Sequence, residues 1–121
     1  MSPEMIVAEQ FAAYNARDLN RFIACFAETI TAVRLPDMVT TLNGKAAYAA
    51  FYARERFAHK GLRAELLGRL VIGNKVTDHE LIHGLGPLPV ETAVMFVVED
   101  GLIVTTFAIP AKSPTQPLTG S

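Results

Sequence analysis

The spacing of apolar residues changes from mainly helical to strand-like at Gly61, and that change limits the folds open to this chain. Before Gly61 the apolar residues recur mostly every three or four positions, which indicates helices. After Gly61 they alternate with polar residues or form β-branched runs, which indicates strands. Helices come first, and the strands that follow are connected by short turns. This order predicts an α+β fold, with the helices on one face of a curved, mainly antiparallel sheet.

Three helices are predicted before Gly61. Ser2 can cap the first, because a serine oxygen accepts a hydrogen bond from the first helical turn. Asp18 can cap the second, whose apolar stripe continues as far as Phe26. The third is expected to span 44–60, where a lysine and a glycine close it.

Six strands are predicted, two within the helical half and four after it. Their expected ranges are 29–35, 39–42, 62–72, 76–83, 90–98 and 102–109. Residues 110–121 are rich in Pro, Ser, Thr and Gly, so we expect a poorly ordered tail after a single domain at 1–109.

Composition excludes several classes of protein. The net charge is −1, whereas a nucleic-acid-binding domain usually has an excess of basic residues. Cys25 is the only cysteine, which rules out an internal disulfide and favours a reducing compartment; its flanking phenylalanines predict a buried, inert thiol. No apolar run is long enough to span a membrane, and the first residues carry acid where a signal peptide carries base. We expect a cytoplasmic protein that binds neither nucleic acid nor membrane.

The third and fourth predicted strands would each show one charged and one apolar face if they alternate regularly. The apolar face then includes His79 and His83, and we expect it to meet the helices. Asp78 and Glu80 fall on the charged face, which we expect to point outward, with Arg69 within cross-strand reach of both.

His79 is the candidate general acid or base, because a histidine in an apolar cavity has a tunable pKa near neutrality. The alternative is a half-buried histidine that hydrogen-bonds the backbone or Tyr14. Residues 79–83 also match the H-E-x-x-H zinc signature, but that motif needs a helix. Four residues along a strand span about 13 Å, too far for one metal. A zinc hydrolase is therefore only a remote alternative.

The last two predicted strands are apolar on both faces. Such strands are normally buried on both sides. In a one-layer sheet the second cover must come from another chain, so we expect a homodimer through the convex face of the sheet.

Several segments together resemble the NTF2-like superfamily, and within it the SnoaL-like and ketosteroid-isomerase-like proteins. They are YNARDLNRFIACFAE, LPD, GKAAYAAFYARERF, VIGNKVTDHELIHG and VVEDGLIV, and the resemblance covers 4–109. It implies a cone in which a strongly curved sheet wraps three helices, with a small-molecule pocket at the open end. No P-loop, dinucleotide fingerprint or CxxC pair is present, and the H-E-x-x-H match lies on a predicted strand, so we expect no cofactor and no metal.

The resemblance also implies isomerase residues that this chain lacks. In ketosteroid-isomerase-like proteins the aspartate that abstracts the proton directly precedes a proline, where this chain has Leu35; Asp37 lies two positions later. The family's second acid corresponds to about Met95, and its oxyanion tyrosine corresponds to Gln10. These departures argue against steroid isomerase chemistry by that mechanism, and Asp37 is either a displaced base or a turn residue.

The sequence thus predicts a protein that binds a small apolar ligand with a carbonyl or hydroxyl group. If it is an enzyme, we expect cofactor-free isomerisation, cyclisation or dehydration, with His79 and Asp37 as the catalytic residues. The alternative is a non-catalytic ligand-binding or dimerisation module of the same fold. The ligand-binding candidates are Tyr14, Phe11, Arg34, Phe51, Tyr52, Met95 and His83.

Overall fold

The computed structural model describes residues 1–111, which form three helices and six strands. In chain order they are α1 (Pro3–Asn15), α2 (Leu19–Ile23), β1 (Phe26–Arg34), β2 (Val39–Asn43), α3 (Lys45–Glu55), β3 (Arg63–Ile72), β4 (Lys75–His83), β5 (Val90–Glu99) and β6 (Leu102–Pro110). None of these helices combines the length and apolar character that a membrane crossing needs.

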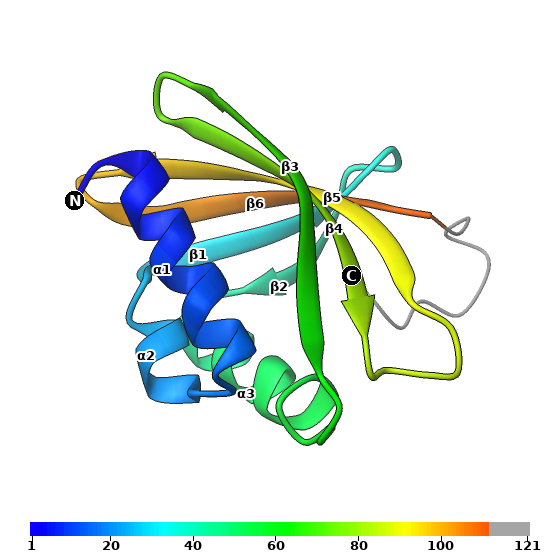
Figure 1. The fold of residues 1–121 in the computed structure, drawn as a ribbon. Coiled ribbons are helices and arrows are strands. Elements are labelled where there is room, and N and C mark those ends of the chain that lie inside the picture. Colours follow the sequence, from blue (N-terminus) through cyan, green and yellow to red (C-terminus); the bar gives the residue numbers. More distant parts are fainter. Residues whose placement is uncertain (112–121) are drawn as a thin grey trace.

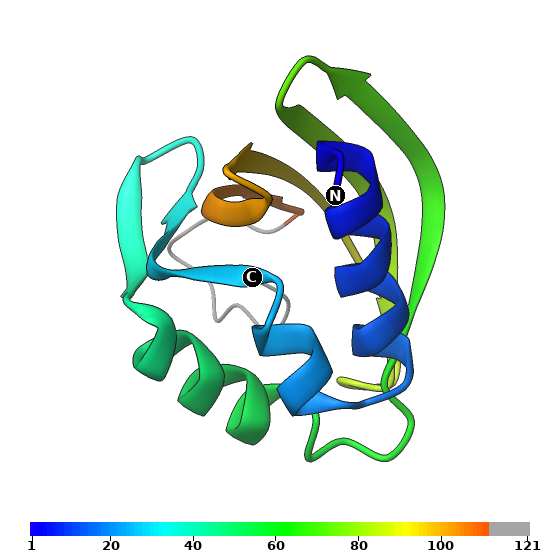
Figure 2. The same ribbon diagram turned by 90° about the vertical axis from the view of Figure 1, so that its left-hand side faces the viewer.

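All six strands belong to one sheet, in the order β2-β1-β6-β5-β4-β3. Only β1 and β6 pair in parallel, and every other neighbouring pair is antiparallel. The sheet curls strongly around the helices (Figure 1). In Figure 2, α1 runs along the β3–β4 side of the sheet and α3 along the β2 side, with α2 between them. The predicted α+β architecture is confirmed.

Both predicted helix caps are present. The Ser2 hydroxyl oxygen accepts a hydrogen bond from the Met5 backbone N–H at 3.2 Å. The Asp18 carboxylate accepts one from the Arg21 backbone N–H at 3.1 Å. Each cap satisfies a backbone donor that the helix itself leaves without a partner.

Three predicted boundaries are wrong. Phe26 begins β1 instead of ending the second helix. The third helix ends at Glu55, not at residue 60, because Arg56 leaves the helical conformation with φ −123°. Pro110 is the last residue of β6, so the tail does not start there; the rest of that prediction, 112–121, lies outside the described residues.

The apolar core lies between the helices and the concave face of the sheet. Phe22, Phe26, Ile30 and Ile103 are almost completely buried there. Phe22 contacts five other aromatic rings, with centroid separations of 4.9 to 6.4 Å. These rings come from both α1 and α3, so the cluster fixes the helices against each other and against the sheet.

A β-bulge in β3 reverses which face of that strand points inward. Before the bulge, Ala64 lies opposite Ile82; after it, Arg69 lies opposite Asp78, with the register shift between Leu66 and Gly68. One extra residue exchanges the two faces of a strand, because side chains alternate with a period of two.

The side chains of β4 consequently face opposite to the predicted directions. Asp78 is 0% exposed and Glu80 is 8% exposed, so both point inward. The prediction that they point outward is wrong, and so is the inward placement of His79 and His83. The predicted reach of Arg69 to Asp78 is confirmed.

Candidate functional site

A pocket opens at the end of the sheet where β1 and β6 finish. The inner faces of all six strands contribute to its wall, and α1 and α3 close the other side. Apolar side chains such as Ile82, Val94 and Phe96 make up much of the lining. Among the described residues that line it, three are charged: Arg34, Arg56 and Glu80.

Glu80 projects from β4 into this pocket and is the only acidic side chain among the described lining residues. Burial raises the pKa of its carboxyl to about 8; the Asp78 charge adds to the rise and the Arg69 charge opposes it. A carboxyl with such a pKa is protonated at neutral pH, so it can donate a hydrogen bond or a proton.

Asp78 is the next inward-facing residue of β4, and it is held by Arg69 of β3. Arg69 Nε donates to Asp78 Oδ1 at 2.7 Å, and Arg69 Nη2 donates to Oδ2 at 2.9 Å. Hydrogen bonding to Asp78 raises the pKa of Arg69 further. The guanidinium fork therefore faces Asp78 rather than Glu80.

Tyr14 of α1 forms a second polar position on the wall. Burial raises the pKa of its hydroxyl well above the usual value, so the phenol keeps its proton. Arg56 donates a hydrogen bond to the Tyr14 hydroxyl, and the charge of Glu80 also acts on it. A tyrosine that accepts from an arginine still has its own proton to donate.

Arg56 reaches the pocket because α3 ends one residue earlier. Its side chain is 3% exposed, and its guanidinium carbon lies 5.2 Å from the Phe51 ring centroid and 5.5 Å from that of Tyr52. Such stacking is a favourable setting for a buried guanidinium. Nothing in the local sequence indicates this role, because Arg56 falls within the predicted third helix, near an end that looks solvated.

Tyr48 and Tyr52 of α3 extend the polar wall. Burial raises the pKa of the Tyr48 hydroxyl well above its usual value, while a hydrogen bond with Thr106 opposes the rise. Thr92 of β5 also lines the pocket, and its hydroxyl donates to the Ile109 carbonyl at 3.1 Å. The pocket thus combines an apolar lining with several hydroxyl groups.

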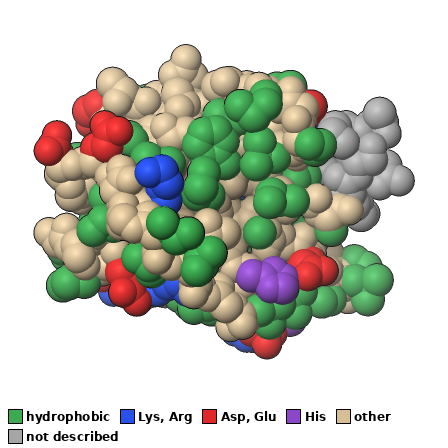
Figure 3. All heavy atoms as spheres, turned by 90° about the horizontal axis from the view of Figure 1, so that it is seen from above, with side chains coloured by type: hydrophobic (Ala, Val, Ile, Leu, Met, Phe, Trp, Pro, Cys, Tyr) green, Lys and Arg blue, Asp and Glu red, His purple; other side chains and the backbone are tan. Residues whose placement is uncertain are grey.

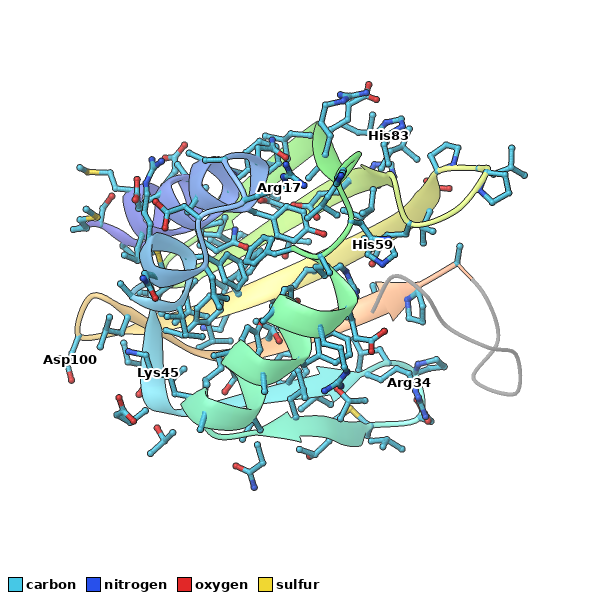
Figure 4. All side chains as sticks on the ribbon, turned by 90° about the horizontal axis from the view of Figure 1, so that it is seen from below. Arg17, Arg34, Lys45, His59, His83 and Asp100 are labelled. Carbon is cyan, nitrogen blue, oxygen red and sulfur yellow. The ribbon has the colours of Figure 1, made fainter. Side chains whose placement is uncertain are left out.

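The two histidines lie on the outer face of the sheet. His79 Nε2 is 2.7 Å from Glu91 Oε2, and the His79 side chain is 49% exposed. His83 Nε2 is 3.0 Å from Glu65 Oε1. Figure 3 shows a histidine beside a carboxylate on the surface, and Figure 4 shows His83 at the rim of the molecule, far from Arg34. Neither histidine lines the pocket.

Asp37 lies in the turn after β1 and pairs with Arg34. Arg34 Nη2 donates to Asp37 Oδ2 at 2.7 Å, and this hydrogen bond lowers the pKa of Asp37. Arg34 lines the pocket, but Asp37 is exposed beside it. Asp37 therefore forms an ion pair within a turn and is not placed to act as a base on a ligand in the pocket.

The other predicted ligand-binding residues divide into two groups. Tyr14 and Tyr52 line the pocket, as Arg34 does, whereas Phe11, Phe51 and Met95 do not. Phe11 packs against the core, and Phe51 lies under the Arg56 guanidinium. Val94 and Phe96 face the pocket, so alternation along β5 points Met95 to the outer face.

The H-E-x-x-H stretch lies on β4, a strand as predicted. Because side chains alternate along a strand, its two histidines point outward while Glu80 points inward. Within residues 1–111 no three Asp, Glu, His or Cys side chains are arranged to hold a metal ion.

Known protein structures with the same fold support the architecture. A candidate ketosteroid isomerase from Kribbella flavida matches at 19% identity and a TM-score of 0.78, covering 96% of this chain and 82% of its own. A candidate polyketide cyclase from Sinorhizobium meliloti matches at 23% identity and a TM-score of 0.72, covering 85% and 92%. A hypothetical protein of ketosteroid isomerase-like fold from Catenulispora acidiphila, in complex with trimethylamine, matches at 23% identity and a TM-score of 0.68. The match covers 89% of this chain and 85% of that protein.

These identities are low enough that the likeness establishes the fold alone, which is NTF2-like. No curated protein matches the sequence. The sequence does match the family model described as the SnoaL-like domain, over residues 7–106. That match spans most of the chain, including every strand but the end of the last, and the protein therefore belongs to the SnoaL-like family.

Proposed function

We propose that this protein binds a small, largely apolar molecule in its pocket and transfers a proton at a carbonyl or hydroxyl group of that molecule through Glu80. The observation that carries the proposal is the buried Glu80 carboxyl on the pocket wall. Glu80 replaces His79 and Asp37 as the proposed catalytic residue, because neither His79 nor Asp37 lines the pocket. Tyr14, Tyr52 and Arg34 are retained as ligand contacts.

In the proposed reaction Glu80 is both the proton donor and the proton acceptor. Below pH 8 the neutral Glu80 gives its proton to the carbonyl oxygen of the ligand. The carboxylate that results takes a proton from the neighbouring carbon, which yields an enol. If a second double bond is conjugated with the enol, Glu80 gives the proton it took to the far carbon, and the enol O–H proton returns to the Glu80 carboxylate; this completes an isomerisation and restores the neutral acid. The Tyr14 hydroxyl, supported by Arg56, can donate a hydrogen bond to the same oxygen and orient the ligand for the transfer.

The similar structures give limited further support. Two of them are candidates for a ketosteroid isomerase and a polyketide cyclase, and both names refer to ketone-bearing compounds. The compartment that we propose is the cytoplasm. The single thiol, Cys25, is buried and its pKa is raised to about 11 by that burial, as suits a structural rather than a reactive cysteine.

The second candidate function is a ligand-binding module without catalysis. It is favoured by the loss of all three isomerase residues, whose positions hold Leu35, Gln10 and, approximately, Met95. In this case Glu80 and Tyr14 serve only as hydrogen-bond donors to a ligand oxygen.

A ligand screen followed by a proton-exchange assay separates the two functions. Thermal shift against phenols, cyclic ketones, hydroxyketones and hydrocarbons of matching size should identify oxygen-bearing ligands. A ligand at 100 times its dissociation constant stabilises by about 2.7 kcal/mol, or several degrees. Deuterium uptake at the α-carbon of a bound ketone, followed by NMR, then measures proton transfer.

For a catalyst we expect exchange to fall at least about a hundredfold in Glu80→Gln while binding persists, since glutamine donates a hydrogen bond but transfers no proton. His79→Gln is the matched control on the opposite face of the same strand and should exchange at the wild-type rate. Binding without exchange in the wild type would favour the module, and no binding by any compound would contradict both functions.

We also propose that a second copy of this chain covers the outer face of the sheet. Met95 and Phe107 pair in the middle of this face, and Leu70, Ile72 and Ile109 are more than half exposed on the same side. Apolar side chains are prominent on the surface in Figure 3. Exposed apolar patches of this kind mark interaction surfaces.

Light scattering should therefore report a dimer at micromolar concentration. Met95→Lys should shift it to a monomer, because the charge would be buried in the contact. Leu88→Lys, in the loop before β5, is the control and should stay dimeric. A monomeric wild-type protein would refute this part of the proposal.

A further inference from the structure

The Asp78–Arg69 pair lies beside the pocket, and the proposed reaction does not use it. Asp78 is 0% exposed, and the side chain of Arg69 is 16% exposed. Burying two charges is costly, and a buried pair adds little net stability compared with apolar residues of similar size. A role in positioning would account for keeping both charges at this place.

The register places Arg69 where it could reach either carboxylate. Asp78 and Glu80 are two positions apart on β4, so their Cα atoms are about 7 Å apart on one face. Arg69 lies directly opposite Asp78 and diagonal to Glu80, a distance that a long side chain can span. In the structure both donors of its fork, Nε and Nη2, are used by Asp78.

We propose that Asp78 is a positioning residue for Glu80: by engaging the Arg69 guanidinium with both of its oxygens, it keeps that cation from pairing with Glu80 and leaves the Glu80 carboxyl facing the ligand. The proposal rests on the proposed function of Glu80. It assigns Asp78 no contact with the ligand, since Asp78 does not line the pocket.

The charges around Glu80 support this role. From its own strand the Asp78 charge raises the pKa of Glu80, and from β3 the Arg69 charge lowers it. From α1, Tyr14 interacts electrostatically with Glu80, and the charge of Glu4 raises the pKa of Arg69. Arg56, after α3, acts on Tyr14, and β5 contributes the uncharged Thr92. Among these groups, Arg69 is the cation whose charge acts on Glu80, and it lies where it can pair with Glu80 once Asp78 no longer holds it.

The test is a direct titration of Glu80 in the intact protein without ligand. Glutamate labelled with ¹³C at the side-chain carboxyl gives an NMR signal for each residue, and the Glu80 signal is the one missing in Glu80→Gln. In Asp78→Asn the Glu80 midpoint should fall by at least about one pH unit, because a negative neighbour is lost and the guanidinium is released to pair with Glu80.

Arg69→Gln should move the midpoint in the opposite direction, since it removes the cation and leaves Asp78. A merely structural pair would also give opposite shifts by charge alone, and the larger would come from Asp78, whose charge acts on Glu80 more strongly than that of Arg69. Release of Arg69 is shown if the midpoint in Asp78→Asn falls below that of the double variant by more than the midpoint in Arg69→Gln rises above it. If Asp78→Asn does not fold, the midpoint in Arg69→Gln still tests the proposal. An unmoved or lower midpoint in Arg69→Gln, or an unmoved one in Asp78→Asn, would overturn the proposal.

The double variant Asp78→Asn, Arg69→Gln replaces both charges with amides, and its midpoint should lie between those of the single variants. The titration needs no substrate, so it decides the role of Asp78 even if the protein is not a catalyst. Unchanged exchange in Glu80→Gln would instead refute the proposed function and leave the titration result standing.

Discussion

At pH 8.5, Glu80→Gln is expected to be more stable than the wild type by on the order of 4 kcal/mol, whereas at pH 4 the two should differ little. The pKa of Glu80 rises from its ordinary 4.5 to about 8 because the fold buries the carboxyl. Each pKa unit corresponds to about 1.4 kcal/mol of free energy between the folded and unfolded states. Urea unfolding at both pH values measures the difference.

The sign follows from which state holds the proton. Between pH 4.5 and 8 the folded protein keeps the Glu80 proton and the unfolded chain does not, so wild-type stability falls as pH rises through this range. Glutamine has no proton to lose and avoids this loss. Glu91→Gln removes an exposed carboxyl from the next strand and should change stability by less than about 0.5 kcal/mol at either pH. An equal gain for Glu80→Gln at both pH values would show that its carboxyl is not the titrating group.

Much of the fold could be predicted because its signals are local. Ser2 and Asp18 occupy cap positions that neighbouring residues alone determine, and both caps form. The turns at residues 73–75 and 99–101 contain glycine between alternating runs, and both join antiparallel strands. Such features depend on few residues, so the sequence is sufficient to find them.

The site was misplaced because one bulge changes the direction of every side chain beyond it. Regular alternation along β3 predicts one inward face for the whole strand, whereas Gly68, a glycine inside a strand pattern, indicates a bulge. On β4 itself, the face with Val76 and Ile82 is the more apolar one, and it carries Asp78 and Glu80 inward. The burial of Asp78 and Glu80 does not follow from the sequence, because acidic residues lie mostly on protein surfaces.

Arg56 could not be predicted at all from local pattern. Its inward direction depends on where α3 ends and on the rings of Phe51 and Tyr52 beneath it, which are properties of the assembled fold. For Tyr14, the sequence predicts a position on the apolar stripe of the first helix but not the hydrogen bond with Arg56, which also depends on the assembled fold.

Phe22→Ala is expected to cost about 4 kcal/mol of the free energy of unfolding. The ring is 1% exposed, and its loss would leave a cavity among five aromatic neighbours. Large-to-small substitutions at such positions cost about 3 to 5 kcal/mol, because the lost burial adds to the cost of the cavity. Urea unfolding at pH 6 gives the value.

Phe51→Ala is the matched control, because it removes the same type of side chain from a partly buried position, where the ring contacts Tyr52 but not Phe22. It should cost less than about 2 kcal/mol, since solvent and neighbouring side chains can fill the space. Three of the rings that touch Phe22, those of Tyr14, Tyr48 and Tyr52, also line the pocket. Phe22→Ala should therefore weaken ligand binding at a temperature where the variant is still folded. Equal costs for the two substitutions would mean that the aromatic cluster is not the element that holds the pocket wall in place.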